Sequence, residues 1–323
     1  MDDGHFQYFF ANEEDKALFE KEPAQYEIQL NGSCARMGAP VNGNPDLYSV
    51  HKGRIYIFGS PECKTRFDAA PEKYLESENA DKPAEAPNAD ARKKGDDLIE
   101  KAVKAMGSPS VIDSLTDYQE KSLSLQSRRG TDVEIRANLT MLFPDRIRAE
   151  QTSPDYANPT VIRKVAIVLS GSEAFVITKE GVNPMPDSYR ADQQRELNRK
   201  PLAILRARKN SGFGAAAIGS ATVSDNNVEQ VSVTIGGLSH TLGIDPASGR
   251  ILSLSYKRRG PGGEFGQVVK TFSDFREVNG VTLPFKITAT FNGQPWKEQS
   301  STIESIAVNS KVDPALFEKP KAN

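Results

Sequence analysis

Hydrophobic and polar residues alternate with a period of two along much of the chain after residue 130. In the clearest run, apolar Val133, Ile135 and Leu139 alternate with polar residues such as Glu134 and Arg136. This alternation is typical of strands in antiparallel sheets, which have one buried face and one solvated face. The same pattern returns between turns rich in Gly, Asn and Asp. It predicts strands at 133–143, 161–169, 174–178, 231–235, 252–256, 268–272 and 281–291.

Three stretches instead carry apolar residues at helical spacing. We expect one helix to begin at Asp96 and end at Gly107, and a short one to begin at Ser108-Pro109. The third stretch covers about residues 190–209, and Pro201 is predicted to kink or divide it. Together these patterns predict a long antiparallel sheet of about eight or more strands, which must curve and be covered by helices.

The first eighty residues contain a repeat. Residues 8–26 align with residues 56–74 at a shift of 48 positions, with seven identities in nineteen positions. The identities are mostly at aromatic, Pro and Lys positions; for example, Phe19 aligns with Phe67. A repeat defines a structural unit, here predicted as a Tyr-x-Phe strand, a turn, a short helix and a closing Pro and Tyr.

The region that contains this repeat resembles the YHS domain family. The resemblance rests on the stretch from Gly53 to Lys64, on Phe67, on Pro71-Glu72-Lys73-Tyr74 and on Asn31-Gly32-Ser33-Cys34-Ala35. It covers about residues 5–76 and implies a small α+β module. Metal-binding relatives tend to have Cys-x-x-x-Cys at the turn before the helix, whereas this chain has Gly59 and Cys63 there.

A segment rich in Ala, Pro and charged residues separates this module from the rest of the chain. Residues 77–95 offer almost nothing to bury, which is typical of a flexible linker. We therefore predict a YHS-like module at 1–76, a linker at 77–95 and a second domain at 96–323. The expected fold class is α+β, with a curved antiparallel half-barrel and a helical lid in the second domain.

The second domain resembles the LolA/LolB-like lipoprotein-carrier superfamily over about residues 95–320. The resemblance rests on His240 to Asp245, on Phe272 to Pro284 with its Asn-Gly hairpin, and on the ending from Ile306 to Pro320. It implies an incomplete barrel with a helical lid, and a cavity that holds acyl chains or other hydrophobic ligands outside the bacterial inner membrane. The same apolar residues could instead form a filled core without a cavity, or line a cavity with another use.

The resemblance suggests a non-enzymatic periplasmic carrier or sensor of a hydrophobic small molecule, a lipid or an acyl chain. Its cavity wall would be made of apolar residues on the alternating strands and on the helical lid. The predicted wall residues are Val133, Ile135, Leu139, Leu252, Leu254, Leu283, Phe285 and Ile287, with Leu202, Ile204 and Leu205 on the lid.

Charge and hydropathy limit the partners. The net charge is −2, so no basic field favours nucleic acid or acidic lipid headgroups. No apolar run approaches the roughly 18–20 residues that a membrane span needs. The chain begins Met1-Asp2-Asp3-Gly4 without a visible signal peptide, which suits either a mature exported protein or a cytosolic one. The second resemblance favours export, and a protein partner is a further expectation.

The two cysteines, Cys34 and Cys63, both lie in the first module. They could form a disulfide, be unrelated buried thiols, or join His51 in a metal site. Three ligands of this kind would suit Cu(I) better than a tetrahedral Zn site. A metal-binding or metal-sensing protein is therefore one alternative function, and a protein-interaction scaffold is another.

Catalytic patterns are missing from the sequence. His5, His51 and His240 are far apart, and no HExxH, Cys-x-x-Cys or Walker-type loop occurs. Ser170-Gly171-Ser172 lacks the elbow pattern of a hydrolase. We expect no enzymatic activity and no required cofactor.

Overall fold

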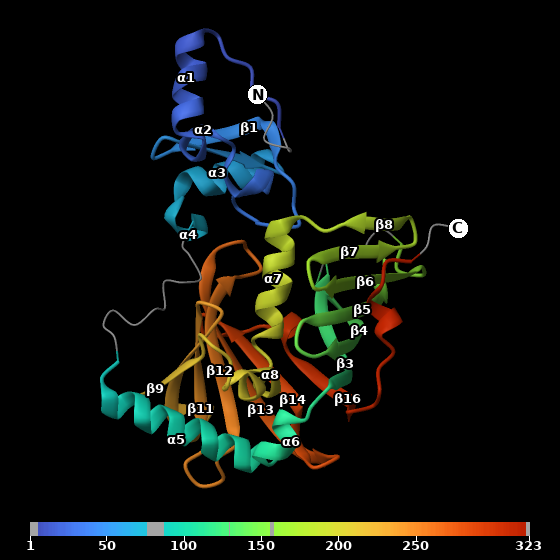
Figure 1. The fold of residues 1–323 in the computed structure, drawn as a ribbon. Coiled ribbons are helices and arrows are strands. Elements are labelled where there is room, and N and C mark those ends of the chain that lie inside the picture. The colour runs from blue at the N-terminus through green and yellow to red at the C-terminus, as the bar shows by residue number, and fades with distance from the viewer. Residues whose placement is uncertain (1–5, 76–86, 129, 156–157, 321–323) are drawn as a thin grey trace. The chain divides into compact units, whose positions relative to one another are not determined.

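The computed structural model describes residues 6–75, 87–128, 130–155 and 158–320 (Figure 1). The described residues fall into two compact units. The first holds the residues up to 75 together with two short segments, 186–192 and 257–266, and the second holds the rest. We predicted a module at 1–76, a linker at 77–95 and a second domain at 96–323; the two short segments that group with the first unit belong to that predicted second domain. The predicted linker lies partly in 76–86, outside the described residues.

The first unit combines short helices with one hairpin. Its elements are α1 (Glu13–Lys21), α2 (Pro23–Tyr26), the 3-10 turn η1 (Gln29–Gly32), β1 (Asn44–His51), β2 (Arg54–Phe58), α3 (Pro61–Ala69) and α4 (Glu72–Leu75). Strands β1 and β2 pair antiparallel, and His51 lies opposite Arg54 at the turn. The largest fully buried side chains of its core are Phe58 and Phe67, and both cysteines lie in this core.

The two copies of the repeat use the same local interactions. Asn12 caps α1 by accepting from the amide of Asp15, and Ser60, 48 positions later, caps α3 by accepting from the amide of Cys63. The ring of Phe19 contacts Phe10 at 5.3 Å, and the ring of the equivalent Phe67 contacts Phe58 at 5.0 Å. The repeat therefore encodes one helix cap and one aromatic cluster twice.

The second unit is built on one large antiparallel sheet. The order of strands is β8-β7-β6-β5-β4-β3-β16-β14-β13-β12-β11-β10-β9, with β15 beside β14, which gives 14 strands among the described residues. Because β16 pairs with β3, the last strand of the chain closes the gap between the two halves of the sheet. The strands are β3 (Asp117–Arg128), β4 (Thr131–Leu142), β5 (Arg146–Pro154), β6 (Ile162–Ser170), β7 (Glu173–Thr178), β8 (Gly181–Pro184), β9 (Gly214–Val223), β10 (Asn226–Ile235), β11 (Leu238–Ile244), β12 (Ile251–Arg259), β13 (Phe265–Val278), β14 (Val281–Phe291), β15 (Gln294–Pro295) and β16 (Ser301–Val308).

The predicted α+β class is confirmed, with an open sheet whose end strands are β8 and β9. All seven predicted strands of the second domain correspond to observed ones, from β4 to β14. The sheet has more strands than the minimum of eight that we expected, because seven others add to the predicted runs: β3, β5, β8, β9, β11, β15 and β16.

Helices lie against one face of this sheet (Figure 1). They are α5 (Ala89–Met106), α6 (Pro109–Asp113), α7 (Asp187–Leu197) and α8 (Pro201–Ala207). Pro201 divides the predicted 190–209 segment and occupies the first turn of α8, where its missing N–H costs no hydrogen bond.

Helix α5 begins earlier than the sequence pattern indicated. Its cap is Asn88, so residues 89–95 belong to the helix and not to the linker that we predicted. The reason is a close approach to the sheet: a Cβ at Gly95 would lie 2.6 Å from the backbone of Ala216 on β9. Only glycine lets the first turns of α5 pack this closely, although glycine alone would argue against a helix.

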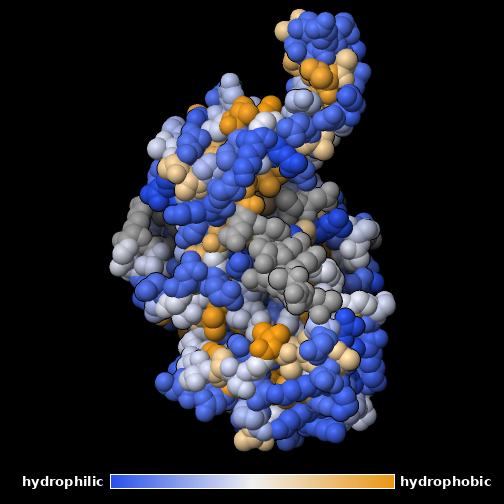
Figure 2. Space-filling view, turned by 90° about the vertical axis from the view of Figure 1, so that its left-hand side faces the viewer, coloured by the Kyte–Doolittle hydropathy of each residue, from blue (hydrophilic) through white to orange (hydrophobic). Residues whose placement is uncertain are grey.

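The surface is mixed in character. On the face seen in Figure 2, hydrophobic side chains occur in small separate groups among mostly hydrophilic ones. Large apolar side chains that are well exposed include Phe9 and Val50 in the first unit and Ile162 in the second. Apolar residues scattered in this way are normal on a folded protein and by themselves define no interface.

Candidate ligand cavity

The strand register places a row of side chains on one face of β3, β4 and β5. Glu120 lies opposite Leu139, and Leu139 lies opposite Ala149 on the next strand. Tyr118 and Met141 form the neighbouring pair of β3 and β4 in the same way. Since alternate residues of a strand share a face, all of these side chains point to the same side of the sheet.

That side of the sheet contains a cavity of about 160 Å³. It lies entirely within the second unit, and its walls come from β3, β4, β5, β13, β14 and β16 and from the segment that includes the end of α7 and the start of α8. The lining side chains are Tyr118, Glu120, Leu139, Met141, Phe143, Ile147, Ala149, Gln193, Glu196, Leu197, Arg199, Lys200, Pro201, Leu202, Lys270, Phe272, Leu283, Pro284, Ile287 and Ile303.

Most of the wall is hydrocarbon. The sheet contributes the largest apolar side chains, among them Met141, Phe272 and Ile287, and the helical segment contributes Leu197 and Leu202. Phe272 and Ile287 face each other directly across β13 and β14. A cavity with such walls favours the hydrocarbon part of a ligand, at about 0.8 kcal/mol for each CH₂ group removed from water.

One part of the wall is charged and buried. The Glu120 carboxylate accepts a hydrogen bond from the Tyr118 hydroxyl at 2.5 Å and one from Lys200 Nζ at 2.8 Å. Burial alone would raise the pKa of Glu120, but the charge of Lys200 and these two hydrogen bonds outweigh it and lower the pKa. Glu120 is therefore ionised near neutral pH, and it holds the residue before α8 against the sheet.

A second charged group lies at the same cavity. Arg199 Nη1 donates to Glu196 Oε1 at 2.7 Å, and Lys270 Nζ lies 3.9 Å from Glu196 Oε2. The Arg199 guanidinium also stacks 4.0 Å above the ring of Tyr256, and Lys270 Nζ lies 5.7 Å from the same ring. The cavity wall thus holds three basic and two acidic side chains, which leaves one positive charge in excess.

The structure brings part of the predicted cavity wall together. Leu139, Leu202, Leu283 and Ile287 line the cavity. The other predicted wall residues lie outside its lining: Val133 and Ile135 further along β4, Ile204 and Leu205 buried within α8, Leu252 and Leu254 on β12, and Phe285 under the Arg276 guanidinium. Most of these residues are buried, whereas Val133 and Leu252 are partly exposed.

The charged part of the cavity was not predicted from the sequence. Glu120, Lys200 and Lys270 come from three distant parts of the chain, and no motif connects them. One usable signal exists: Tyr118 and Glu120 have the spacing of residues that share a strand face. An acidic residue on a face that is otherwise apolar would have drawn attention, had the strand at 117–128 been predicted.

The structure brings two of the three predicted metal ligands of the first unit into one core, and the third, His51, lies apart from them. Cys34 and Cys63 are free thiols in one core, whereas His51 Nε2 lies 3.1 Å from Glu72 Oε1 on the surface. Arg36 Nη1 approaches Cys63 Sγ at 3.7 Å. Within the described residues, no three His, Cys, Asp or Glu side chains are placed to hold a metal ion.

The Cys63 thiol has an unusual environment. Burial raises its pKa, but hydrogen bonds from Ser60, Arg36 and Cys34 and the positive charge of Arg36 outweigh this effect and lower the pKa. Cys63 also lies in the first turn of α3, where the helix dipole favours a negative charge. The thiolate form is therefore stabilised at this position.

Residues 37–78 match the YHS domain family. The chain therefore carries a YHS domain, as the resemblance of the repeat region implied, and the match includes β1, β2, α3 and α4. The comparison with curated proteins gives no match.

Several solved structures match the larger part of the chain. A DUF1329 family protein from Desulfovibrio piger is 14% identical, with 71% of this chain and 97% of that chain covered and a TM-score of 0.45. A LolA superfamily protein from Nitrosomonas europaea is 12% identical, with 70% and 97% covered and a TM-score of 0.45. A putative outer membrane lipoprotein-sorting protein domain from Vibrio parahaemolyticus is 9% identical, with 70% and 97% covered and a TM-score of 0.41. Because these scores are below 0.5, we take the fold from the strands and helices above.

None of the helices in the described part of the chain is both long enough and apolar enough to cross a membrane.

Proposed function

We propose that this protein is a carrier or sensor of a hydrophobic ligand, such as a lipid or an acyl chain, and that it acts without catalysis. The observation that supports the proposal is the cavity between the sheet and the α7–α8 segment, with its mainly hydrocarbon walls. Fully packed side chains would leave no such space between the sheet and these helices, because protein interiors are close-packed. In keeping with the lipoprotein-carrier resemblance, we propose that the protein works in the bacterial periplasm or is otherwise exported.

The size of the cavity bears on how the ligand enters. Its volume of about 160 Å³ is below the roughly 300–1,000 Å³ that small-molecule pockets usually have. A longer acyl chain would need more space than this. We therefore propose that the α7–α8 segment moves away from the sheet when a ligand binds, since this segment forms one side of the cavity.

A cavity-filling variant tests the proposal. Ala149 points into the cavity from β5, so Ala149→Phe should occupy the space that a chain would take. Thr140→Phe is the matched control, because Thr140 follows Leu139 on β4 and points to the opposite face of the sheet. We expect uptake of N-phenyl-1-naphthylamine, an uncharged apolar fluorophore, to fall at least tenfold in Ala149→Phe and to persist in Thr140→Phe.

Native mass spectrometry supplies the second readout. Protein expressed with export and purified without detergent should carry an added mass that is released as free lipid on denaturation. A wild-type protein that carries no added mass and takes up no fluorophore would contradict the carrier proposal.

A second candidate function is metal binding or metal sensing through the two thiols of the YHS domain. The observation that favours it is the buried Cys34–Cys63 pair with a stabilised Cys63 thiolate. These residues do not fit a Cu or Zn site as they stand, because Arg36 occupies the approach to Cys63 Sγ and His51 faces Glu72. Thiol titration with and without added metal tests this function: two titratable thiols that one metal ion protects would support metal binding, and a disulfide would exclude it.

A further inference from the structure

The cavity of the proposed carrier has a charge imbalance at its wall. Three basic side chains, Arg199, Lys200 and Lys270, meet two acidic ones, Glu120 and Glu196. Lys200 is hydrogen-bonded to Glu120, and Arg199 to Glu196. Lys270 is the third cation, and it lies 3.9 Å from the Glu196 carboxylate that Arg199 already engages.

The position of Lys270 connects the charge to the hydrocarbon part of the cavity. Its side chain is only 16% exposed. It comes from the middle of β13, two residues before Phe272, so the ammonium and the phenyl ring share the inner face. A buried ammonium is costly unless an opposite charge compensates it. In a ligand with an anionic head and an apolar chain, the head would match the Lys270 ammonium and the chain would match the Phe272 ring.

Further polar atoms lie close to this charge. The Tyr256 ring, which lies beneath Arg199 and beside Lys270, is 1% exposed, and its hydroxyl has no hydrogen-bond partner among the described residues. The adjacent His240, whose ring packs edge-on against Tyr256 at 6.1 Å, has both ring nitrogens buried without a partner there. Buried polar groups in folded proteins are normally satisfied. Neither Tyr256 nor His240 belongs to the cavity lining, so they add polar character near Arg199 and Lys270 and make no direct contact with a ligand in the cavity.

From these observations we infer that the ligand is a monoanionic amphiphile, and that Lys270 binds its charged head while the hydrocarbon wall binds its chain. This inference rests on the proposed function and adds the chemical class of the ligand. One negative charge neutralises the excess positive charge of the wall, whereas a dianion would leave one negative charge unpaired in a buried site. The carboxylate of a fatty acid has the charge that fits.

The test compares two ligands of equal chain length that differ only in the head: decanoate and decan-1-ol. Each displaces N-phenyl-1-naphthylamine from the full-length protein, and the ratio of their inhibition constants cancels the contribution of the shared chain. Lys270→Met keeps the hydrocarbon stem and removes the charge. It should shift the ratio about tenfold or more against decanoate, as expected for the loss of one hydrogen bond to a charged group. Binding of decan-1-ol should stay within threefold of wild type.

Two further variants make the result specific. Lys270→Arg keeps the charge and should restore the preference for decanoate. Lys297→Met removes a lysine that pairs with Asp132 outside the cavity, and it should leave the ratio unchanged. If Lys270→Met is poorly folded by circular dichroism, Lys270→Gln replaces it in the same comparison.

The outcomes separate the inference from the function on which it rests. An unchanged ratio in a folded Lys270 variant that binds both ligands overturns the inference and leaves the carrier function intact. Failure of the wild type to bind the fluorophore and both ligands overturns both. Displacement by acetate or inorganic phosphate alone would indicate a free-anion site and would overturn the amphiphile inference.

Discussion

At the scale of single residues, the second domain contains an imidazole in an unfavourable position. His240 on β11 is 2% exposed, and neither ring nitrogen has a partner among the described residues. Burial lowers the pKa of His240 to about 4, and the nearby positive charge of Arg199 adds to this effect, while Glu196 opposes it. The ring is therefore neutral in the folded protein at pH 6.5, the pH at which it is half-protonated in the unfolded chain.

This shift predicts a loss of stability in mild acid. Between pH 6.5 and about 4 the unfolded state binds a proton at His240 and the folded state does not, so stability falls as the pH falls through this window. Linkage gives a loss of about 2 kcal/mol between pH 7.5 and 5 from this residue alone. His240→Phe keeps the aromatic contact with Tyr256 and removes the titration. Urea unfolding at both pH values should show a smaller acid penalty in the variant by about this amount. Equal penalties in the two proteins would contradict the assignment.

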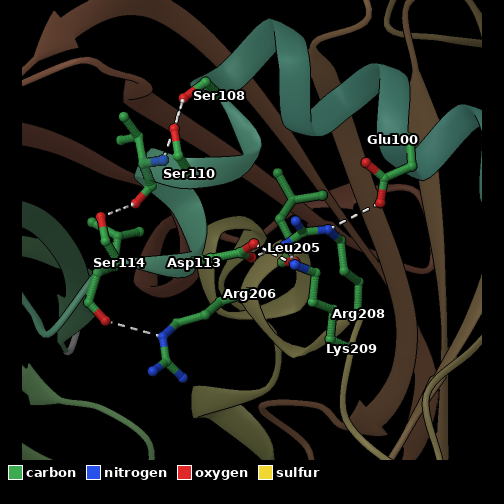
Figure 3. A network of polar contacts seen from close by, with 11 residues as sticks. Glu100, Ser108, Ser110, Asp113, Ser114, Leu205, Arg206, Arg208 and Lys209 are labelled. Atoms are coloured by element: carbon green, nitrogen blue, oxygen red, sulfur yellow. Dashed lines mark hydrogen bonds and ion pairs between the residues drawn. The ribbon is translucent and has the colours of Figure 1, made fainter.

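At the scale of elements, one arginine connects three helices. Arg208 follows α8; its Nε donates to Glu100 on α5 at 3.0 Å and its Nη1 to Asp113 on α6 at 2.6 Å (Figure 3). The Arg208 side chain is 3% exposed. The next residue, Lys209, also reaches Asp113 but is largely exposed. The helices over the sheet are therefore held together by a buried guanidinium and not only by apolar contact.

Removing that guanidinium should loosen the helices. We expect Arg208→Met to lower the free energy of unfolding by about 2–3 kcal/mol, because two hydrogen bonds to carboxylates are lost at a buried position. Lys209→Met removes an exposed ion pair with the same Asp113 and should cost less than about 1 kcal/mol. Chemical denaturation of both variants checks the difference. Equal losses of unfolding free energy in the two variants would mean that the burial of Arg208 adds no stability beyond that of an exposed ion pair.

The sequence predicted elements best where a strict pattern exists. The alternation at Val133 to Phe143 and at Val281 to Phe291 predicted β4 and β14 almost to their ends. Strand β9 was missed because it begins with the small residues Gly214 to Ala217, which give no period-two contrast. These small residues let α5 pack closely on β9, so the physical reason for them lies in a contact that is distant in sequence.

The candidate cavity could be predicted only in its apolar half. Alternation identifies apolar positions such as Leu139 and Ile287 that share one face of a sheet. The charged half depends on pairs such as Glu120 with Lys200, which are 80 residues apart and meet only because β3 runs under the start of α8. Periodicity describes a single element, and it carries no information about which elements pack together.

At the scale of the whole molecule, the two candidate functions lie in different units. Every residue of the cavity wall belongs to the second unit, and both cysteines belong to the first. The segments 186–192 and 257–266 group with the first unit, yet neither contributes a lining residue. The ligand site is therefore complete without any residue of the YHS domain.

A truncated chain should accordingly keep the ligand site. We expect residues 87–323, expressed alone, to fold and to bind N-phenyl-1-naphthylamine within about threefold of the full-length affinity, because α5 keeps its Asn88 cap and β3 keeps its pairing with β16. Some loss of thermal stability is expected, since the segments 186–192 and 257–266 lose the unit with which they group. Fluorescence titration of the fragment beside the full chain measures the affinity, and circular dichroism shows whether the fragment is folded. A folded fragment that no longer binds the fluorophore would show that the YHS domain takes part in ligand binding, and the two candidate functions would then be one.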